Sequence, residues 1–417
     1  MVYDQRREMN IELGCDRGMD GIFSLALLLV LVLAQNPDWG SSSLLWWGSI
    51  AFLSMAFFIG CRGWLYLEGN YSLWLFAFLG ICFFSFFWAI QPALVLTSLK
   101  NMVVHLVILI FIRSLIRTEQ GINRVLLLLL VSVVINVIWL LYSNAELFET
   151  MGGSAEVLDR LGSEGNWNAN VIGMMAAIAM LVSLYFQKNI RNVYVKLLLF
   201  LVVALMIFVT FLSGSRKALL MVLMGFCGFV FVSSKGKRLR ALIIIAGMVL
   251  LLYYLVMEVP FFHSIIGWRI EGFISSFTGV GSVDESTAVR EKFVKDALRV
   301  WQENPLIGVG LDCYRNVNLV DLGIYAHNNY VELLADIGIL GTVVYYSSYL
   351  YCFLNLIKPR KKDLQTWLLL VMLLIMTVID YGFVSYNSFL NKILLMLMFS
   401  KISLQRQQGA GLKVKLW

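Results

Sequence analysis

Charged residues are scarce in this chain, and their scarcity excludes a soluble protein. Only 14% of the 417 residues are charged, whereas 60% are hydrophobic. A soluble domain typically has ~25% charged and roughly 45–50% apolar residues. No folded core needs so much apolar surface, so most of it must face lipid. Because no long polar stretch could build a core of its own, we expect a single integral membrane domain over residues 1–417.

Proline and cysteine are also rare. The five prolines all lie at the ends of apolar runs or in loops, and no internal repeat is visible. Alternating-access transporters often depend on broken helices and repeated halves, so this sequence disfavours a transporter. The six cysteines do not form a disulfide framework, because only Cys313 is expected on the oxidising side of the membrane.

The apolar residues fall into runs long enough to cross a bilayer. The first twenty residues mix acids with bases and lack the pattern of a cleavable signal peptide, so we expect a cytoplasmic N-terminus. Reading runs of about 17–25 residues as spans predicts an all-α protein with about twelve transmembrane helices. The predicted spans are 19–35, 42–60, 71–90, 93–112, 122–142, 168–186, 195–213, 217–234, 239–258, 329–354, 364–383 and 387–404.

The distribution of basic residues predicts the orientation. The formal net charge of +7 does not indicate a nucleic-acid partner, because the bases lie in short connectors and not on one binding face. Bases concentrate in the even-numbered connectors, whereas the connector at 143–167 has only Arg160 among its acids. The positive-inside rule then places both termini of this inner-membrane protein in the cytoplasm.

One connector, residues 259–327, is long, and this topology places it outside the cytoplasm. Apolar residues recur at helical spacing within it, from Ser286 to Trp301, with bases around them. Ser286 or Thr287 can cap this helix, and Asn304-Pro305 ends it. Such a helix could lie at the lipid interface or simply pack over the bundle. Arg290 belongs to it, and an arginine in that setting often forms only the solvated face.

A short motif, Ser213-Gly214-Ser215-Arg216-Lys217, lies at the predicted outer start of the eighth span. Ser213 or Ser215 can cap the helix, and its first backbone N–H groups are then directed toward the outer surface. A helix N-terminus beside an arginine suits a phosphate, which the guanidinium can bind with two hydrogen bonds. Two interfacial bases that merely extend to the headgroups would give the same pattern, although bases on this side oppose the topology.

A histidine stands where the long connector enters the tenth span. His327 has a side chain suited to taking a proton from a hydroxyl near neutral pH. Glu332 and Asp336 lie four residues apart on one helical face, and a carboxylate that reached the imidazole would orient it. The spacing does not show which carboxylate does so, and a histidine at this boundary can also be a plain polar cap.

Lys100 lies within the fourth span, roughly two turns from its outer end, where it could extend a cationic site. No motif for a metal, a nucleotide or a dinucleotide cofactor is present. We therefore expect neither a metal nor another cofactor.

Three segments together resemble the O-antigen ligase / O-antigen polymerase family, bacterial membrane glycosyltransferases of the C-type fold. They are Gly214-Ser215-Arg216, the run from Arg290 to Gly310 that includes Asn304-Pro305-Leu306-Ile307-Gly308, and His327 to Leu334 with Gly338 and Gly341. The resemblance is close over roughly 200–345. It implies metal-independent, inverting transfer of a glycan from an undecaprenyl-diphosphate-linked oligosaccharide. By motif position, Arg216 and Arg290 would bind the diphosphate and His327 would deprotonate the acceptor hydroxyl, with Lys100, Ser215, Glu332 and Asp336 as supporting residues.

The family divides by acceptor. A polymerase, which we favour, extends a lipid-linked repeat unit in polysaccharide biosynthesis. A ligase moves the glycan onto lipid A-core, and the third alternative is a transporter of polyprenyl lipid or polysaccharide. The resemblance implies a membrane-lipid environment and a glycan or lipid-linked acceptor, and it makes a chain-length regulator a candidate partner.

Overall fold

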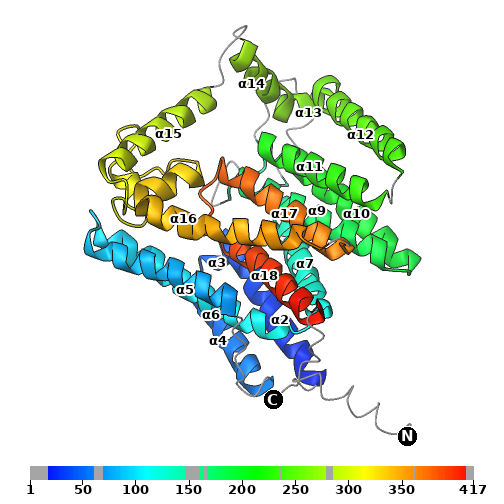
Figure 1. The fold of residues 1–417 in the computed structure, drawn as a ribbon. Helices are drawn as coiled ribbons and strands as arrows, with labels where there is room; N and C mark the ends of the chain where they lie inside the picture. Colours follow the sequence, from blue (N-terminus) through cyan, green and yellow to red (C-terminus); the bar gives the residue numbers. More distant parts are fainter. Residues whose placement is uncertain are drawn as a thin grey trace, which may run out of the picture.

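The computed structural model describes residues 17–60, 69–145, 160–162, 167–234, 237–278, 285–359 and 362–409. These residues form helices and connecting segments, with no strand among them (Figure 1). Twelve helices coincide with the twelve predicted spans. They are α2 (Arg17–Gln35), α4 (Ser43–Gly60), α5 (Gly69–Phe84), α6 (Pro92–Leu115), α7 (Glu119–Ser143), α9 (Ala169–Asn189), α10 (Val193–Leu212), α11 (Arg216–Ser233), α12 (Arg238–Glu258), α16 (Asn329–Ile357), α17 (Leu364–Asp380) and α18 (Phe389–Gly409).

Length and composition support a polytopic membrane protein. Eight helices of the described chain are long and apolar enough to cross a bilayer: α5 with the short η1 (Ser85–Phe87), α6, α7, α9, α10, α11, α12 and α16. Three shorter apolar helices lie at Gly21–Gln35, Ser43–Ile59 and Leu364–Asp380. The fourth predicted span, which contains Lys100 and His105, is one of the eight. The count of twelve spans stays a prediction.

The helices differ in how far they are enclosed. The apolar stretch of α9 is 83% buried, and α9 packs against α7, α10, α11 and α17. The corresponding stretch of α12 is 17% buried, with outward-facing side chains such as Leu239 and Leu250. Lipid tails are as apolar as these side chains, so the side chains can face outward into a bilayer without loss of stability. The centre of the bundle is therefore α9, and α12 lies at its edge (Figure 1).

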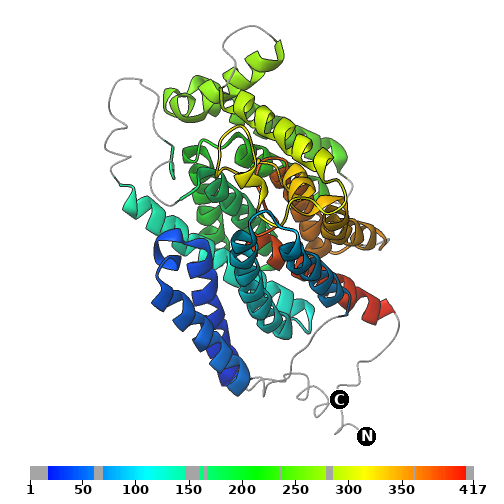
Figure 2. The same cartoon turned by 90° about the vertical axis from the view of Figure 1, so that its left-hand side faces the viewer.

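The long connector is largely helical. Its elements are α13 (Pro260–Phe262), η3 (His263–Gly267), α14 (Trp268–Thr278), α15 (Glu285–Glu303) and η4 (Tyr314–Asn316). The predicted amphipathic helix is α15, which buries Phe293, Ala297 and Val300 and packs against α16. It begins at Glu285, so the predicted caps Ser286 and Thr287 lie inside it. Figure 2 shows α14 and α15 together at one end of the bundle.

Glycine, not proline, breaks a helix here. Gly338 interrupts α16 with φ 65° and ψ −172°. The segment after α15 lies against the break, where Ile339 N–H donates to the carbonyl of Pro305 and Val309 N–H donates to that of Ala335. The backbone groups freed by the break are thus satisfied by another segment, as membrane-embedded backbone requires. The absence of proline from the spans did not mean that every span is unbroken.

Candidate functional site

The Ser213–Lys217 motif forms a tight turn between α10 and α11. Gly214 adopts a left-handed φ of 56°, and Ser215 caps α11 by accepting a hydrogen bond from Ala218 N–H. The Ser215 hydroxyl also donates to the amide oxygen of Asn170, at the start of α9 (2.9 Å). Ser215 therefore holds the N-termini of α9 and α11 together, and its supporting role in the site stays a prediction.

A glycine on α9 allows this close approach. A Cβ at Gly173 would lie 2.3 Å from Cβ of Ala218 and 2.9 Å from Oγ of Ser213. Real side chains do not approach so closely, so a larger residue would push α11 away from α9. The first residue of α11 is Arg216, whose Nη1 donates to the carbonyl oxygen of Arg269 in α14 (3.1 Å). The turn thus presents Arg216 toward the connector.

His327 is held in an unusual backbone conformation. It has a φ of 54°, which is uncommon for residues other than glycine and costs of order 1 kcal/mol or more. Its ring lies 4.3 Å from that of Tyr325 and 5.8 Å from that of Phe293 in α15, measured between centroids. The next residue, Asn328, caps α16 by accepting from Tyr330 N–H. Neighbours on both sides therefore fix the orientation of the imidazole.

The structure brings His327 close to Arg290 and to Lys217, a residue that the sequence prediction did not include among the site residues. Burial, together with the positive charges of Arg290 and Lys217, lowers the pKa of His327 to about 4. The imidazole is consequently neutral at neutral pH, which is the form that can accept a proton. Lys217 also lies within electrostatic reach of Arg216 and Arg290.

Arg160 is the second residue that the prediction did not include. Leu161 N–H donates to the carbonyl of Leu212 (2.8 Å), so this segment lies against the α10–α11 turn. Burial and the charge of Arg216 lower the pKa of the Arg160 guanidinium. Both missed residues had a signal in the sequence: Lys217 is part of the quoted motif, and Arg160 is the lone base of its connector.

The two predicted carboxylates, Glu332 and Asp336, accept hydrogen bonds from backbone N–H groups of the connector. Glu332 is fully buried, and its Oε2 accepts from the N–H of Ala326, the residue before His327. Asp336 accepts from the N–H groups of Asp312 (3.0 Å) and Tyr314 (2.8 Å) in the connector. Among the described residues neither carboxylate bonds to the imidazole. The hypothesis that one of them orients His327 directly therefore lacks support, and Glu332 acts one residue away.

Glycines of the second and third motifs allow the segment after α15 to pack closely against the break in α16. A Cβ at Gly308 would lie 2.4 Å from the carbonyl of Asp336, and one at Gly338 would lie 2.3 Å from that of Leu306. Both residues also have positive φ, so each motif needs glycine for space and for conformation. The run from Asn304 to Gly310 thus ties α15 to the broken helix that carries Glu332.

Lys100 lies apart from this cluster. Its side chain is exposed on α6, with the ammonium 6.0 Å from the centroid of the Trp47 ring. Its supporting role stays a prediction. No group of three or more His, Cys, Asp or Glu side chains suited to a metal ion occurs among the residues that the structure describes.

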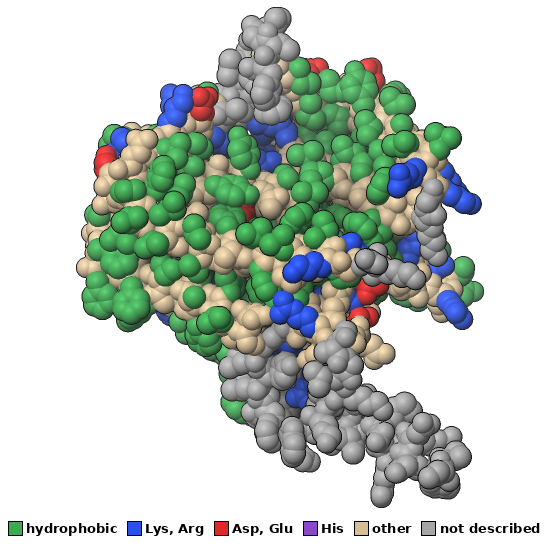
Figure 3. Space-filling view, viewed as in Figure 1, with side chains coloured by type: hydrophobic (Ala, Val, Ile, Leu, Met, Phe, Trp, Pro, Cys, Tyr) green, Lys and Arg blue, Asp and Glu red, His purple; other side chains and the backbone are tan. Residues whose placement is uncertain are grey.

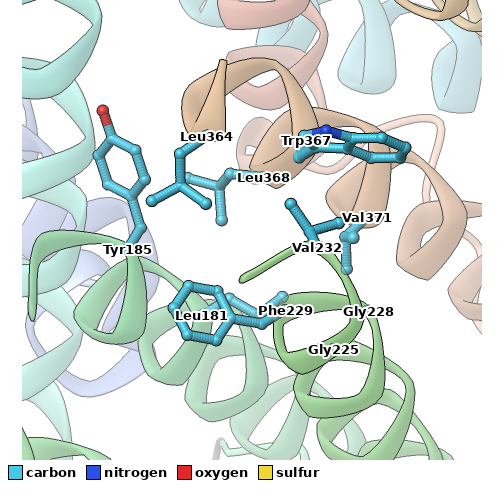
Figure 4. Close-up of a pocket in the computed structure, with 10 residues that line it drawn as sticks. All are labelled: Leu181, Tyr185, Gly225, Gly228, Phe229, Val232, Leu364, Trp367, Leu368 and Val371. Atoms are coloured by element: carbon cyan, nitrogen blue, oxygen red, sulfur yellow. The ribbon is translucent and has the colours of Figure 1, made fainter. Parts of the chain in front are cut away.

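Two hollows lie along the contact between α9, α11 and α17. One is shallow and lined by Lys217, Asn170, Met221, Gly382 and other, mostly apolar residues. The other, farther along α11, is lined by apolar and aromatic residues, among which Tyr185 has a hydroxyl group (Figure 4). In Figure 3, Lys and Arg side chains are recessed below the apolar surface near the top of the view. Only the first hollow has a charged group suited to an anionic ligand.

The comparison with protein families agrees with this arrangement. Residues 201–346, about a third of the chain, match the family model described as O-antigen ligase. This confirms the resemblance to the O-antigen ligase / O-antigen polymerase family over the segment that contains Arg216, Arg290 and His327. No curated protein matches the chain.

Proposed function

We propose that this protein is a glycosyltransferase that moves a glycan from an undecaprenyl-diphosphate-linked donor onto an acceptor hydroxyl. The observation that carries the proposal is the convergence of Arg216, Lys217 and Arg290 with a neutral imidazole, His327, at one end of the bundle. The family match supports ligase- or polymerase-type activity. A cationic group beside a base is the combination that this reaction needs.

The proposed step is a direct displacement. The acceptor oxygen attacks the anomeric carbon from the face opposite the diphosphate and forms a new C–O bond. The bond between that carbon and the diphosphate oxygen breaks, and its electron pair leaves on undecaprenyl diphosphate. The hydroxyl proton passes to a ring nitrogen of His327. Arg216 and Arg290 stabilise the charge that develops on the leaving group, where such stabilisation is most effective.

Release of the polyprenyl carrier tests the activity. Purified protein in liposomes, given lipid-linked donor and acceptor, should release one undecaprenyl diphosphate for each new glycosidic bond. A transporter would instead move intact donor across the bilayer with no undecaprenyl diphosphate released. That result would refute the glycosyltransferase assignment.

The acceptor separates the two enzymatic candidates. We favour a polymerase, for which lipid-linked repeat units alone should suffice to give a ladder of products. The ligase candidate is favoured by the description of the matching family model, and it predicts product only when lipid A-core or another terminal acceptor is added. Assays with each acceptor alone, with equal amounts of the same donor, distinguish them.

We also propose that the site faces away from the cytoplasm of the inner membrane. The support is the distribution of bases along the sequence. A single cysteine in place of exposed Lys292 on α15 should react with a membrane-impermeant thiol reagent in intact cells. A cysteine in place of exposed Lys188, at the other end of α9, should react only after the membrane is opened. The reverse pattern would overturn the orientation.

A further inference from the structure

Lys217 lies close to two other cationic side chains, Arg216 and Arg290. It is the second residue of α11 and half-buried, and the charges of Arg290 and Arg216 lie close enough to act on it. No carboxylate of the described residues pairs with it, in contrast to Arg299 and Arg315, which have acidic partners three residues away. A half-buried ammonium without a carboxylate partner is costly to keep charged, and a bound anion lowers that cost.

The position of the Lys217 ammonium depends on a glycine in the turn after α17. A Cβ added at Gly382 would lie 1.3 Å from Nζ of Lys217 and 2.2 Å from its Cε. The ammonium therefore occupies the space that a side chain at 382 would fill. Lys217 lines the hollow together with Asn170 and Gly382.

The ligand suited to this hollow carries several negative charges on neighbouring atoms. The hollow is lined by the first turns of both α9 and α11, whose N-termini favour anions. Arg216 on α11 and Arg290 on α15 lie within electrostatic reach of the Lys217 ammonium. A diphosphate can contact several of them at once.

We propose that Lys217 binds the diphosphate of the lipid-linked donor from the hollow between α9, α11 and α17, as a third cationic ligand beside Arg216 and Arg290. This inference rests on the proposed function, and it adds a residue that selects a diphosphate over a monophosphate. It also has a consequence for His327. Because Lys217 and Arg290 lower the pKa of the imidazole, a bound diphosphate that neutralises them raises that pKa and makes His327 a stronger base.

The test is binding of undecaprenyl diphosphate and undecaprenyl monophosphate to the full-length protein in lipid nanodiscs. Lys217→Met, which removes the charge and keeps the length, should weaken diphosphate binding about 10- to 100-fold, the loss of one charge-assisted contact. Monophosphate binding should weaken much less. Lys217→Arg should retain most of the affinity.

Gly382→Ala provides a variant with unchanged charge. The added methyl group displaces the ammonium, so diphosphate affinity should fall while Lys217 is still present. Lys295→Met is the matched control, because Lys295 is exposed on α15 and paired with Glu291. Its diphosphate affinity should equal that of the wild type. In Lys217→Met, the acid limb of kcat/KM should also move to higher pH, which loss of packing alone would not cause.

The outcomes separate the inference from the proposed function. Wild-type protein that prefers diphosphate, together with a Lys217→Met variant of equal affinity and preference, would refute the role of Lys217 and leave the function standing. Wild-type protein that binds neither polyprenyl phosphate would refute the function itself. Equal losses for both ligands in Lys217→Met would also overturn the inference, because they would show no selection for the second phosphate.

Discussion

Two lysines near the two ends of α17 show how differently this protein uses a buried cation. Lys401 of α18 is fully buried, and its ammonium donates to Glu119 of α7 (2.7 Å) and to Asp363. Asp363 caps the start of α17 by accepting from Thr366 N–H. Lys217 lies against Gly382, just beyond the other end of α17. A helix of this length separates the two environments by about 25 Å.

The difference between the lysines lies in their neighbours. Lys401 has carboxylate partners that compensate its burial and tie three helices together, so we interpret it as structural. Lys217 has no carboxylate partner among the described residues, and it lies within electrostatic reach of Arg216, Arg290 and His327. A buried cation with carboxylate partners in the protein indicates a structural role. A buried cation that lacks them and lies close to other cations indicates a binding site.

The largest effect is expected when the proposed base, His327, is removed. His327→Asn should reduce turnover by about 10²–10⁴-fold, the usual contribution of a positioned base. Asparagine tolerates the left-handed backbone of this position better than alanine does, so folding should be retained. Donor binding and single-turnover rates, measured separately on purified protein, check the prediction. His327→Ala and His327→Gln should show the same loss.

Two results would contradict the role of His327. Unchanged turnover in His327→Asn would remove the base from the mechanism. Lost donor binding with a normal rate once saturated would make His327 a positioning residue.

The arginines test whether geometry matters beyond charge. Arg216→Lys and Arg290→Lys each keep one positive charge but lose the planar two-pronged guanidinium. Each should lower turnover about 10²–10³-fold, the typical cost of losing transition-state charge stabilisation. Arg191→Lys, in the connector between α9 and α10 and exposed, is the control. Near-normal rates in both site variants, at equal expression, would leave these arginines as ordinary interfacial bases.

The pH dependence tests the electrostatic coupling. An isolated imidazole would lose activity below about pH 6.5. In the free enzyme the pKa of His327 is about 4, and protonation removes the base, so kcat/KM should hold as the pH falls and decline only near pH 4. With donor bound, the anion raises this pKa, so kcat should decline at a higher pH than kcat/KM does. Coincident declines of both near pH 6.5 would mean that the cations do not act on His327.

The sequence predicted the helices better than their interruptions. Runs of about twenty apolar residues are governed by the thickness of the bilayer, so helices coincide with all twelve predicted spans. The break at Gly338 was not predicted because its cause is remote. Pro305 and Leu306 supply the hydrogen-bond partners, more than thirty residues earlier in the chain. Helix α14 was missed because its 11 residues lack a long apolar run.

Part of the candidate site was not predicted, again because its cause lies far away in the chain. The motifs gave Arg216, Arg290 and His327. The structure brings Arg290 within electrostatic reach of His327, and Lys217 lies within reach of all three. Helical spacing showed that Glu332 and Asp336 share a face, but not that both bond to backbone N–H groups of the connector. The importance of Lys217 depends on the turn at Gly382, 165 residues later, which no local pattern contains.

The smallest expected effect concerns stability, and it returns to the two lysines. Lys401→Met leaves Glu119 and Asp363 without their cation, but these side chains are 41% and 46% exposed and can be hydrated. We expect a loss of roughly 1–2 kcal/mol in the free energy of unfolding, with normal turnover per folded molecule. Lys217→Met should leave stability unchanged or raise it by up to ~1 kcal/mol, because it relieves repulsion at the expense of activity. Thermal unfolding of both variants without donor, in the same nanodiscs, measures the difference. A Lys217→Met variant less stable than Lys401→Met would show that Lys217 holds the helices together, and the contrast between a structural and a functional lysine would fail.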